Sequence, residues 1–495
     1  MDSNKSKHLI WVLFAVVLAL RIILAFQTSY FSYDSYSHIR QVNSILETGK
    51  PVFEDKLSGG GKTFFFSPLF HYIFALLSLI APLDIIGKII PNILYALLIP
   101  LVYCLSLKIA NGPKPALFAS AFAALFPALW QTINSLDPLC LAIPAIFYCF
   151  YCLLRVNEKK YLALFILSGV FAAFLSPITL FIIPALWLFV LLLKIEKTEE
   201  RDVVMEAIIF LSFLVILAQF LLYKKALLVH GYEIIWQNIP PQLLNAFFEN
   251  ITILGVIAAV GVVPFIFGVY EVYRTSFTKK EREISAIISL TIIFAFVLWL
   301  KLVKVQEGML ILGICLAIIS AKVVDSVEAY TKKTKVNISF LHAALVILII
   351  AALTSVPAAI SIIRNSAEDV PDKNEIDAML WLRENSSENA VVAASTKEGF
   401  LINAVALRKN IIDNNFLMVA NPGTRYSDVA EIYQTNFETE AVGLLNKYRS
   451  KYILLSKNTL REFNSSDLRY ADIKCFEKFY ENNETVIYKT WCDVE

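Results

Sequence analysis

LIWVLFAVVLALRIILAF, residues 9–26, is the stretch that first indicates the fold class. It is longer than the apolar core of a signal peptide and leads to no small-residue cleavage site, so we interpret it as a retained span. Lys5 and Lys7 precede it and favour a cytoplasmic N-terminus. Similar runs recur along the chain, which is 57% apolar and only 17% charged. This pattern predicts a polytopic α-helical membrane protein.

The sequence predicts about eleven transmembrane helices, since a bilayer core needs roughly 20 helical residues per crossing. The ten spans after the first are expected at residues 84–108, 115–131, 138–154, 161–176, 177–194, 207–222, 251–271, 284–301, 308–323 and 338–363. The apolar stretch 66–82 lies inside a first external loop, residues 27–83, and we interpret it as a juxtamembrane helix. Counting it as a crossing would move the basic loops away from the cytoplasmic side.

A separate soluble domain is expected after the last span, because charged and polar residues intersperse with short apolar runs from residue 364 onward. We therefore divide the chain into a transmembrane module, 1–363, and an extracytoplasmic domain, 364–495. Helical spacing at 375–383 and 438–448, with strand-like runs at 390–394 and 452–456, predicts an α/β fold. Cys475 and Cys492 both lie in this domain and would pair in an oxidising space or remain as free thiols.

The most informative polar stretch is YDSYSHIR, residues 33–40, shortly after the first span. Asp34 and His38 are four positions apart, so a helix would project both from one face. A carboxylate at the membrane surface can bind a divalent cation or accept a proton from a hydroxyl. The alternative is that Asp34 only caps the N-terminus of a helix.

Two further acids are candidates. Asp137 lies in NSLDP, residues 134–138, a turn between two spans where an aspartate could equally be a helix cap. Asp34 and Asp137 are expected to face one cavity at the external rim and to hold a hard cation, Mg²⁺ or Mn²⁺. Glu233 could supply a third oxygen ligand, or it could be an ordinary glutamate of an exposed loop.

Lysines in a short external turn suggest a site for an anionic lipid. Lys301 and Lys304 break the cytoplasmic bias of positive charge, and such lysines suit a lipid phosphate or simply extend towards the headgroups. The chain contains no Walker loop, dinucleotide fingerprint or HExxH motif. A net charge of +2 gives no indication of a nucleic-acid partner.

The arrangement resembles the GT-C class of membrane glycosyltransferases, particularly the catalytic subunit of oligosaccharyltransferase and its shorter archaeal relatives. The resemblance is carried, in order, by DSYSHIR (34–40), ILETG (45–49) with Asp55, SPLF (67–70) and NSLDPL (134–139). It implies that Asp34 and Asp137 form the acidic pair of the site and that Glu233 is the later loop glutamate. It also implies that Lys304 stands where relatives place an arginine that contacts lipid phosphate.

One departure from that family bears on the acceptor. Oligosaccharyltransferases carry a WWDYG segment that reads the acceptor sequon, whereas the comparable place here is STKEGF, residues 395–400. Transfer of a whole glycan to asparagine is therefore not expected.

The resemblance implies an inverting glycosyltransferase that moves a sugar from a polyprenyl-phosphate donor to a glycan or protein acceptor on the extracytoplasmic face of the cell membrane. Asp34 is expected to act as base or metal-linked carboxylate, with Asp137 beside it. Lys304 and Arg40 are expected to stabilise the leaving phosphate, and His38 to orient Asp34 or touch the sugar. The alternatives are a lipid or glycan transporter and an enzymatically silent scaffold.

Overall fold

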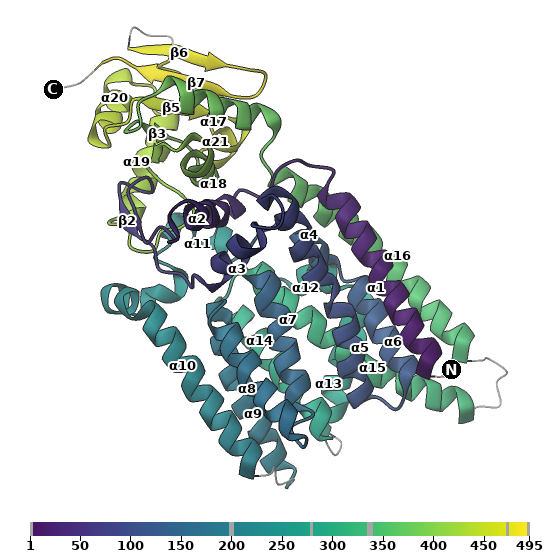
Figure 1. Cartoon of the computed structure of the whole chain (residues 1–495). Helices are drawn as coiled ribbons and strands as arrows, with labels where there is room; N and C mark the ends of the chain where they lie inside the picture. The colour runs from purple at the N-terminus through teal and green to yellow at the C-terminus, as the bar shows by residue number, and fades with distance from the viewer. Residues whose placement is uncertain (1–2, 198–201, 278–280, 334–339, 472–474, 493–495) are drawn as a thin grey trace. The chain divides into compact units, whose positions relative to one another are not determined.

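A computed structural model describes residues 3–197, 202–277, 281–333, 340–471 and 475–492 (Figure 1). The chain divides into two compact units, and each unit is assembled from three separate stretches of sequence. We call them the membrane unit, residues 1–28, 85–222 and 247–367, and the α/β unit, residues 29–84, 223–246 and 368–495.

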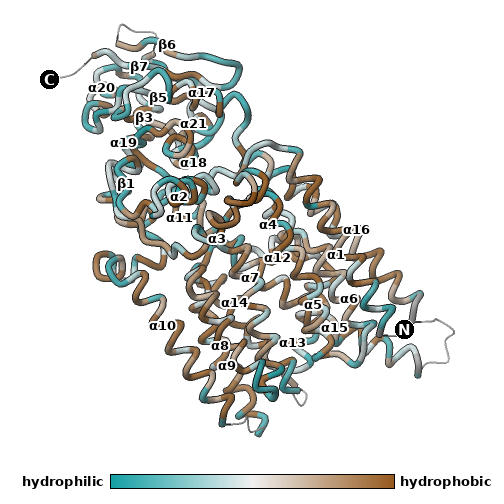
Figure 2. Tube along the Cα trace, in the orientation of Figure 1, coloured by the Kyte–Doolittle hydropathy of each residue, from teal (hydrophilic) through white to brown (hydrophobic). Residues whose placement is uncertain are grey.

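Helices make up nearly all of the membrane unit. In chain order they are α1 (Ser3–Ala25), α4 (Leu83–Ala96), α5 (Leu98–Ile109), α6 (Pro113–Ala124), the short helix η1 (Pro127–Thr132), α7 (Leu139–Leu153), α8 (Lys159–Ala173), η2 (Pro177–Phe181), α9 (Ile182–Ile195), α10 (Asp202–His230), α12 (Ile253–Val260), α13 (Val262–Phe277), α14 (Arg282–Trp299), α15 (Val305–Lys333) and α16 (Phe340–Glu368). Figure 2 shows how apolar residues dominate helices such as α8, α9, α10 and α14.

Fewer helices are long enough to cross a bilayer than the eleven that the sequence predicts. Among the described residues, seven helices are long and apolar enough to span a bilayer, and a bent pair, α12 with α13, makes an eighth if it is one span. Helices α6, α7 and α8 fall in the other predicted spans but have only 12, 15 and 15 residues. The polytopic helical fold class is confirmed, with seven or eight spans by length and composition.

The predicted span over residues 251–271 is not one straight helix. Helices α12 and α13 meet at 113°. Gly261 separates them with φ at 95°, a backbone conformation that favours glycine. A Cβ on Gly261 would lie 2.5 Å from the Ser355 hydroxyl oxygen, so the bend also depends on a close approach to α16.

Helix α15 forms the centre of the membrane unit, packing against α5, α6, α13 and α14. Small residues permit this close packing, as is usual between membrane helices. A Cβ on Gly268 of α13 would lie 2.6 Å from Leu316, and one on Gly313 of α15 would lie 2.3 Å from Phe126.

A five-stranded sheet organises the C-terminal part of the α/β unit, in the order β4-β3-β5-β7-β6. The strands are β3 (Val391–Ala393), β4 (Lys409–Asn410), β5 (Tyr452–Leu455), β6 (Phe476–Glu481) and β7 (Val486–Thr490). Strand β3 is parallel to β4 and β5, and β7 is antiparallel to β5 and β6. The helices of this part are α17 (Lys373–Asn385), α18 (Thr396–Leu401), the π-helical turn η4 (Ile402–Ala406), α19 (Pro422–Gln434), α20 (Glu438–Lys447) and α21 (Lys457–Glu462).

Both faces of this sheet are covered, as the uninterrupted apolar strand β5 requires. Ile453 packs into a core with residues of α19 and α20, whereas Leu454 packs into a second core with residues of α17. Successive strand side chains point to opposite faces, so one short strand contributes to both cores. The predicted α/β domain is confirmed, and Cys475 and Cys492 form a disulfide in it.

The first loop belongs to the α/β unit rather than to the membrane unit. It contains α2 (Ser35–Thr48), the two-residue strands β1 (Glu54–Asp55) and β2 (Lys62–Thr63), and α3 (Leu69–Leu77). At nine residues α3 is about 14 Å long, too short to cross a bilayer. The stretch 223–246, which holds the C-terminal turns of α10, η3 (Gly231–Trp236) and most of α11 (Pro241–Phe247), also groups here. The boundary at residue 363 stays a prediction.

Candidate functional site

Asp34 occupies the N-cap position of α2 but does not act as a cap. Its side chain makes no capping hydrogen bond, and its backbone is already helical, with φ −63° and ψ −28°. Residues that cap a helix through their side chain usually have extended backbone angles. The Asp34 residue is exposed, and its Oδ1 accepts a hydrogen bond from Nδ2 of Asn414 at 2.8 Å. The capping alternative is therefore wrong for this side chain.

Tyr33, directly before Asp34, fixes the backbone beside this carboxylate. Its hydroxyl donates to Oε2 of Glu375 at 2.6 Å and accepts from Nδ2 of Asn458 at 2.6 Å. Its backbone N–H donates to the carbonyl of Asp369 at 3.2 Å. Burial, followed by the charge of Glu375, raises the pKa of Tyr33 above its usual range, so the phenol stays neutral and keeps its proton for this bond.

His38 pairs with a second histidine that the sequence analysis did not single out. Its Nδ1 lies 3.0 Å from Nε2 of His71 on α3, so one nitrogen donates and the other accepts. Burial, with His38 adding to the effect, lowers the pKa of His71 well below its usual range. The Phe66 ring packs edge-on against His71, with centroids 4.9 Å apart. The proposed contact of His38 with Asp34 or sugar stays a prediction.

Arg40 uses both terminal nitrogens on one carboxylate. They lie 2.5 and 2.7 Å from the two carboxylate oxygens of Asp55, a fork-like arrangement that fixes orientation strongly. The Asp55 side chain is fully buried and the Arg40 side chain is 15% exposed. The pair ties α2 to β1, and a phosphate-binding role for Arg40 stays a prediction.

The β1–β2 hairpin of the first loop is held by the last residue of β4 and by the segment that follows it. Ser58 and Lys62 both donate to Asp413, the latter at 2.7 Å from Oδ1. The N–H of Gly59 donates to Oδ1 of Asn410 at 2.7 Å. We call these contacts the hairpin clamp. They attach the loop that carries Asp34 to the C-terminal sheet.

Asp137 serves the start of α7 in the membrane unit. Its Oδ1 accepts the backbone N–H of Leu139 at 2.8 Å, which agrees with the helix-start alternative for one of its oxygens. The turn before it depends on Arg21, the single charge inside the first span. Arg21 is fully buried and donates to Oδ1 of Asn92 at 2.9 Å, to the carbonyl of Leu129 at 2.7 Å and to Oγ1 of Thr132 at 2.8 Å.

Arg21 is the residue of this region that sequence reasoning missed. An isolated ionisable side chain in an apolar run is itself a signal, because it must find polar partners inside the protein. Here its partners are backbone and neutral side-chain oxygens of α4 and η1. The network therefore holds η1, the short helix that precedes Asp137 in the chain, against α1 and α4.

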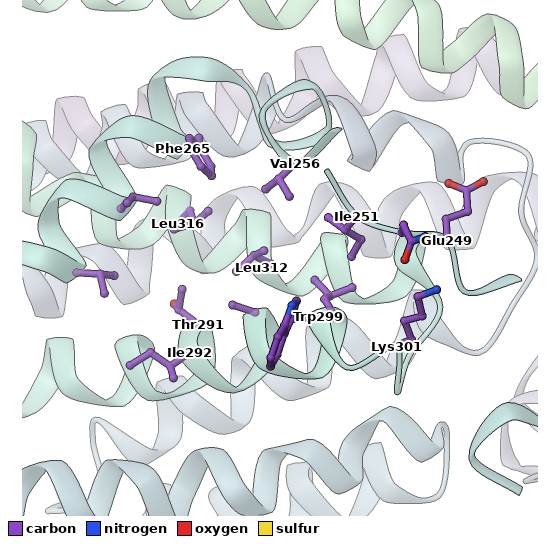
Figure 3. Close-up of a pocket in the computed structure, with 15 residues that line it drawn as sticks. Glu249, Ile251, Val256, Phe265, Thr291, Ile292, Trp299, Lys301, Leu312 and Leu316 are labelled. Atoms are coloured by element: carbon purple, nitrogen blue, oxygen red, sulfur yellow. The ribbon is translucent and has the colours of Figure 1, made fainter. Parts of the chain in front are cut away.

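An apolar groove of about 500 Å³ lies among α12, α13, α14 and α15 of the membrane unit. Its walls include Val256, Phe265 and Leu312. Figure 3 shows Glu249 and Lys301 together at one end of the groove. Lys304 follows in the same turn, with its Nζ 5.5 Å from the centroid of the Phe247 ring. An apolar cavity that ends at an acid and a lysine, with Lys304 beside them, can take an amphiphile with a charged head.

Glu233 lies in η3 of the α/β unit and is exposed. Across the part of the chain that the structure describes, no three histidine, cysteine or acidic side chains gather as ligands for a metal ion. In neither unit, taken alone, does the donor set fit Mg²⁺ or Mn²⁺, and no reaction step is derived through one. Asp34, His38, Arg40 and Glu233 belong to the α/β unit, whereas Asp137 and Lys304 belong to the membrane unit. The common cavity for the two aspartates stays a prediction.

The STKEGF segment, residues 395–400, builds the interior of the α/β unit. Ser395 caps α18, and the buried Glu398 accepts hydrogen bonds from the hydroxyls of Ser395 at 2.6 Å and Ser456 at 2.5 Å. Burial is the main cause that raises the pKa of Glu398 to about 8 and that of Glu462 to about 7. The segment therefore supports the fold through a buried, hydrogen-bonded acid, Glu398, whose raised pKa favours the protonated form.

No family model and no curated protein matches the sequence. Solved structures do match. The archaeal oligosaccharyltransferase AglB from Archaeoglobus fulgidus, in complex with an inhibitory peptide and a dolichol-phosphate, has a TM-score of 0.67 at 15% identity, over 90% of this chain and 69% of that one. ArnT from Cupriavidus metallidurans, bound to undecaprenyl phosphate, has a TM-score of 0.60 at 9% identity, over 98% of both chains.

A third similar structure is the arabinofuranosyltransferase AftD from Mycobacteria, with a TM-score of 0.53 at 13% identity, over 97% of this chain and 40% of that one. All three are GT-C glycosyltransferases, so the present chain has the GT-C fold. The fold expected from YDSYSHIR and NSLDPL is thereby confirmed.

Proposed function

We propose that this chain is an inverting glycosyltransferase that takes its sugar from a polyprenyl-phosphate donor in the cell membrane. The observation that carries the proposal is the Asp34 carboxylate, which is exposed, makes no capping bond and follows the firmly held Tyr33. The GT-C fold and the groove that ends at Lys301 support it. A transporter would need the groove but no general base.

The proposed reaction is a single displacement at the anomeric carbon. The acceptor hydroxyl oxygen forms a bond to this carbon while the bond between the carbon and the phosphate oxygen breaks. The hydroxyl proton passes to Asp34, and polyprenyl phosphate leaves with the bonding electron pair. Attack on the face opposite the phosphate inverts the anomeric configuration. The reaction needs no covalent intermediate.

The remaining predicted residues have supporting roles in this proposal. Asp137 acts in the same reaction as the second acid, and Lys304, Lys301 and Arg40 offset the charge of the departing phosphate. Glu233 keeps a proposed role as a loop acid of the site. Mg²⁺ or Mn²⁺ would need more donors than either unit supplies alone, so no step of the reaction is assigned to a cation. Treatment with a chelator followed by addition of each ion tests this point, since a loss of activity that an added ion restores would contradict it.

The proposed membrane orientation follows the lysines near the start of the chain. We place the N-terminus in the cytoplasm and the α/β unit outside, which suits the disulfide between Cys475 and Cys492. The acceptor is then a glycan or protein on the outer face. Because no WWDYG segment is present, we exclude asparagine sequons from the proposed acceptors.

The test uses purified full-length protein with labelled polyprenyl-phosphate hexoses and a membrane extract as acceptor. We expect release of free polyprenyl phosphate, with loss of release in Asp34→Ala. Glu47→Ala is the matched control, because Glu47 is an exposed acid of the same helix α2. Undiminished release by Asp34→Ala would overturn the assignment of the base, whereas absence of release by the wild-type protein would favour the transporter.

A further inference from the structure

We propose that Asn414 is a positioning residue of the transfer reaction, whose side-chain amide holds the Asp34 carboxylate in the orientation needed for proton removal. The inference rests on the proposed function, because it takes Asp34 as the base. Nδ2 of Asn414 donates to Oδ1 of Asp34 at 2.8 Å, although the two residues are 380 positions apart in sequence. The C-terminal part of the chain thus contributes directly to the orientation of the candidate base.

The chemistry of the contact admits one orientation of the amide. A carboxylate only accepts hydrogen bonds, so the NH₂ group of Asn414 must face Asp34. Oδ1 of Asn414 is buried and has no hydrogen-bond partner among the described residues. An unsatisfied buried oxygen costs stability, and an asparagine retained only for folding would be expected to use both ends of its amide.

The contact also leaves the carboxylate available for chemistry. Only Oδ1 of Asp34 accepts this bond, and no helix N–H is bonded to the side chain. Within the described ranges, Oδ2 of Asp34 has no hydrogen-bond partner. One oxygen is therefore held in place while the other is open to the hydroxyl of an acceptor.

The segment around Asn414 is rigid enough to position another side chain. Asp413, its neighbour, is buried and takes part in the hairpin clamp through Lys62 and Ser58. Gly399 of α18 closes the other side, because a Cβ there would lie 2.3 Å from the carbonyl oxygen of Ile412. The backbone that carries Asn414 is thus held on both sides, which limits the positions that its amide can take.

The decisive experiment is a double-mutant cycle with turnover as the readout. Asn414→Ala should lower kcat about 10- to 100-fold with the KM for the donor little changed, because a charge-assisted bond that orients the base is lost. In an Asp34→Glu background, where the carboxylate is already displaced, Asn414→Ala should have no further effect. If Asn414 has a role in folding alone, Asn414→Ala should lower kcat by the same factor in both backgrounds. That result would overturn the inference.

Two further variants keep the result interpretable. Asn414→Asp preserves shape but places a like charge against Asp34, so it should reduce kcat at least as much as Asn414→Ala. Asn389→Ala is the control, because Asn389 is an exposed asparagine of the same unit whose amide oxygen accepts only from Lys409 among the described residues. A normal kcat in Asn414→Ala beside an inactive Asp34→Ala would refute the positioning role alone. An active Asp34→Ala would instead refute Asp34 as the base, the part of the proposed function on which this inference rests.

Discussion

Nζ of Lys62 lies 2.7 Å from Oδ1 of Asp413, and these two side chains are 1% and 0% exposed. Burial lowers the pKa of Lys62, although the neighbouring carboxylate acts in the opposite direction. A buried pair of this kind is costly to break, because removal of one partner leaves an uncompensated charge. The pair is the centre of the hairpin clamp.

We expect Asp413→Ala to lower the free energy of unfolding of the α/β unit by about 3 to 5 kcal/mol. Thermal unfolding of the full chain in detergent, combined with limited proteolysis of the hairpin, measures this. Lys478→Met is the control, because Lys478 pairs with Glu481 on the surface and should cost less than about 1 kcal/mol. Equal effects of the two variants would contradict the importance of the clamp.

The buried acids predict a fall in stability with rising pH. The pKa of Glu398 is raised to about 8 and that of Glu462 to about 7, so the folded unit holds both protons where the unfolded chain, with pKa values near 4.3, has lost them. Stability should be highest below about pH 4.3 for these groups and should decline until about pH 8. Other carboxylates limit stability in acid.

The measurement is the thermal midpoint of the full chain in detergent from pH 5 to 9. Glu398→Gln keeps hydrogen-bonding groups for Ser395 and Ser456 but cannot ionise. We expect the thermal midpoint of this variant to fall less between pH 6 and 8 than that of the wild-type chain. The remaining fall is assigned to Glu462. A midpoint that is independent of pH in the wild-type chain would refute the prediction.

Two glycines of the α/β unit should respond oppositely to alanine. Gly399→Ala places a Cβ 2.3 Å from the carbonyl oxygen of Ile412 and 2.6 Å from Cβ of Asp413, so we expect a loss of about 1 to 3 kcal/mol and a misplaced Asn414. Gly443→Ala, in α20, meets nothing within 4 Å and should stabilise the helix by about 0.5 to 1 kcal/mol. Denaturant unfolding of each variant measures the change in its free energy of unfolding, which should be negative for Gly399→Ala and positive for Gly443→Ala.

The groove predicts how the lipid donor binds. Loss of charge in Lys301→Ala or Lys304→Ala should weaken binding of polyprenyl phosphate by about tenfold each, because each amine is assigned to the phosphate. Binding is measured by displacement of a labelled lipid in detergent. Lys194→Ala, in the last turn of α9, is the control for general loss of positive charge. Equal binding by all three variants would show that Lys301 and Lys304 do not bind the lipid phosphate.

Filling the groove should block the lipid without altering its charged end. Ala295 lines the groove, and Ala295→Trp introduces a large ring into a space of about 500 Å³. We expect binding of polyprenyl phosphate to fall at least tenfold, whereas Leu353→Trp, at a 71% exposed position of α16, should leave it unchanged. Unaltered binding by Ala295→Trp would show that the groove is not the site at which polyprenyl phosphate binds.

Local patterns predicted the regular elements well. Apolar periodicity placed α17 and α20, and short apolar runs placed β3 and β5, because each element is encoded by adjacent residues. The same logic identified YDSYSHIR as a helix start. It offered two roles for Asp34 and could not choose between them, since the choice depends on a bond to Asn414, 380 positions away.

Long-range polar contacts were beyond this type of reasoning. Asn414 and Asp413 lie in a turn without periodicity, and nothing in their spacing identifies Asp34 or Lys62 as partners. His71 was expected only as part of a juxtamembrane helix, and its pairing with His38 depends on how α3 folds back on α2. The bend at Gly261 was likewise hidden, because the apolar run continues through it.

The α/β unit joins segments that are synthesised far apart in time. Lys62 emerges from the ribosome 351 residues before Asp413, an interval of roughly 20 to 70 s at ordinary rates of translation. Throughout that delay the first loop has neither its ion-pair partner nor the sheet against which Tyr33 is buried. A chain interrupted before residue 410 would leave this loop without a partner and open to proteases. The last quarter of the polypeptide thus completes a structure whose first strands were made near its beginning.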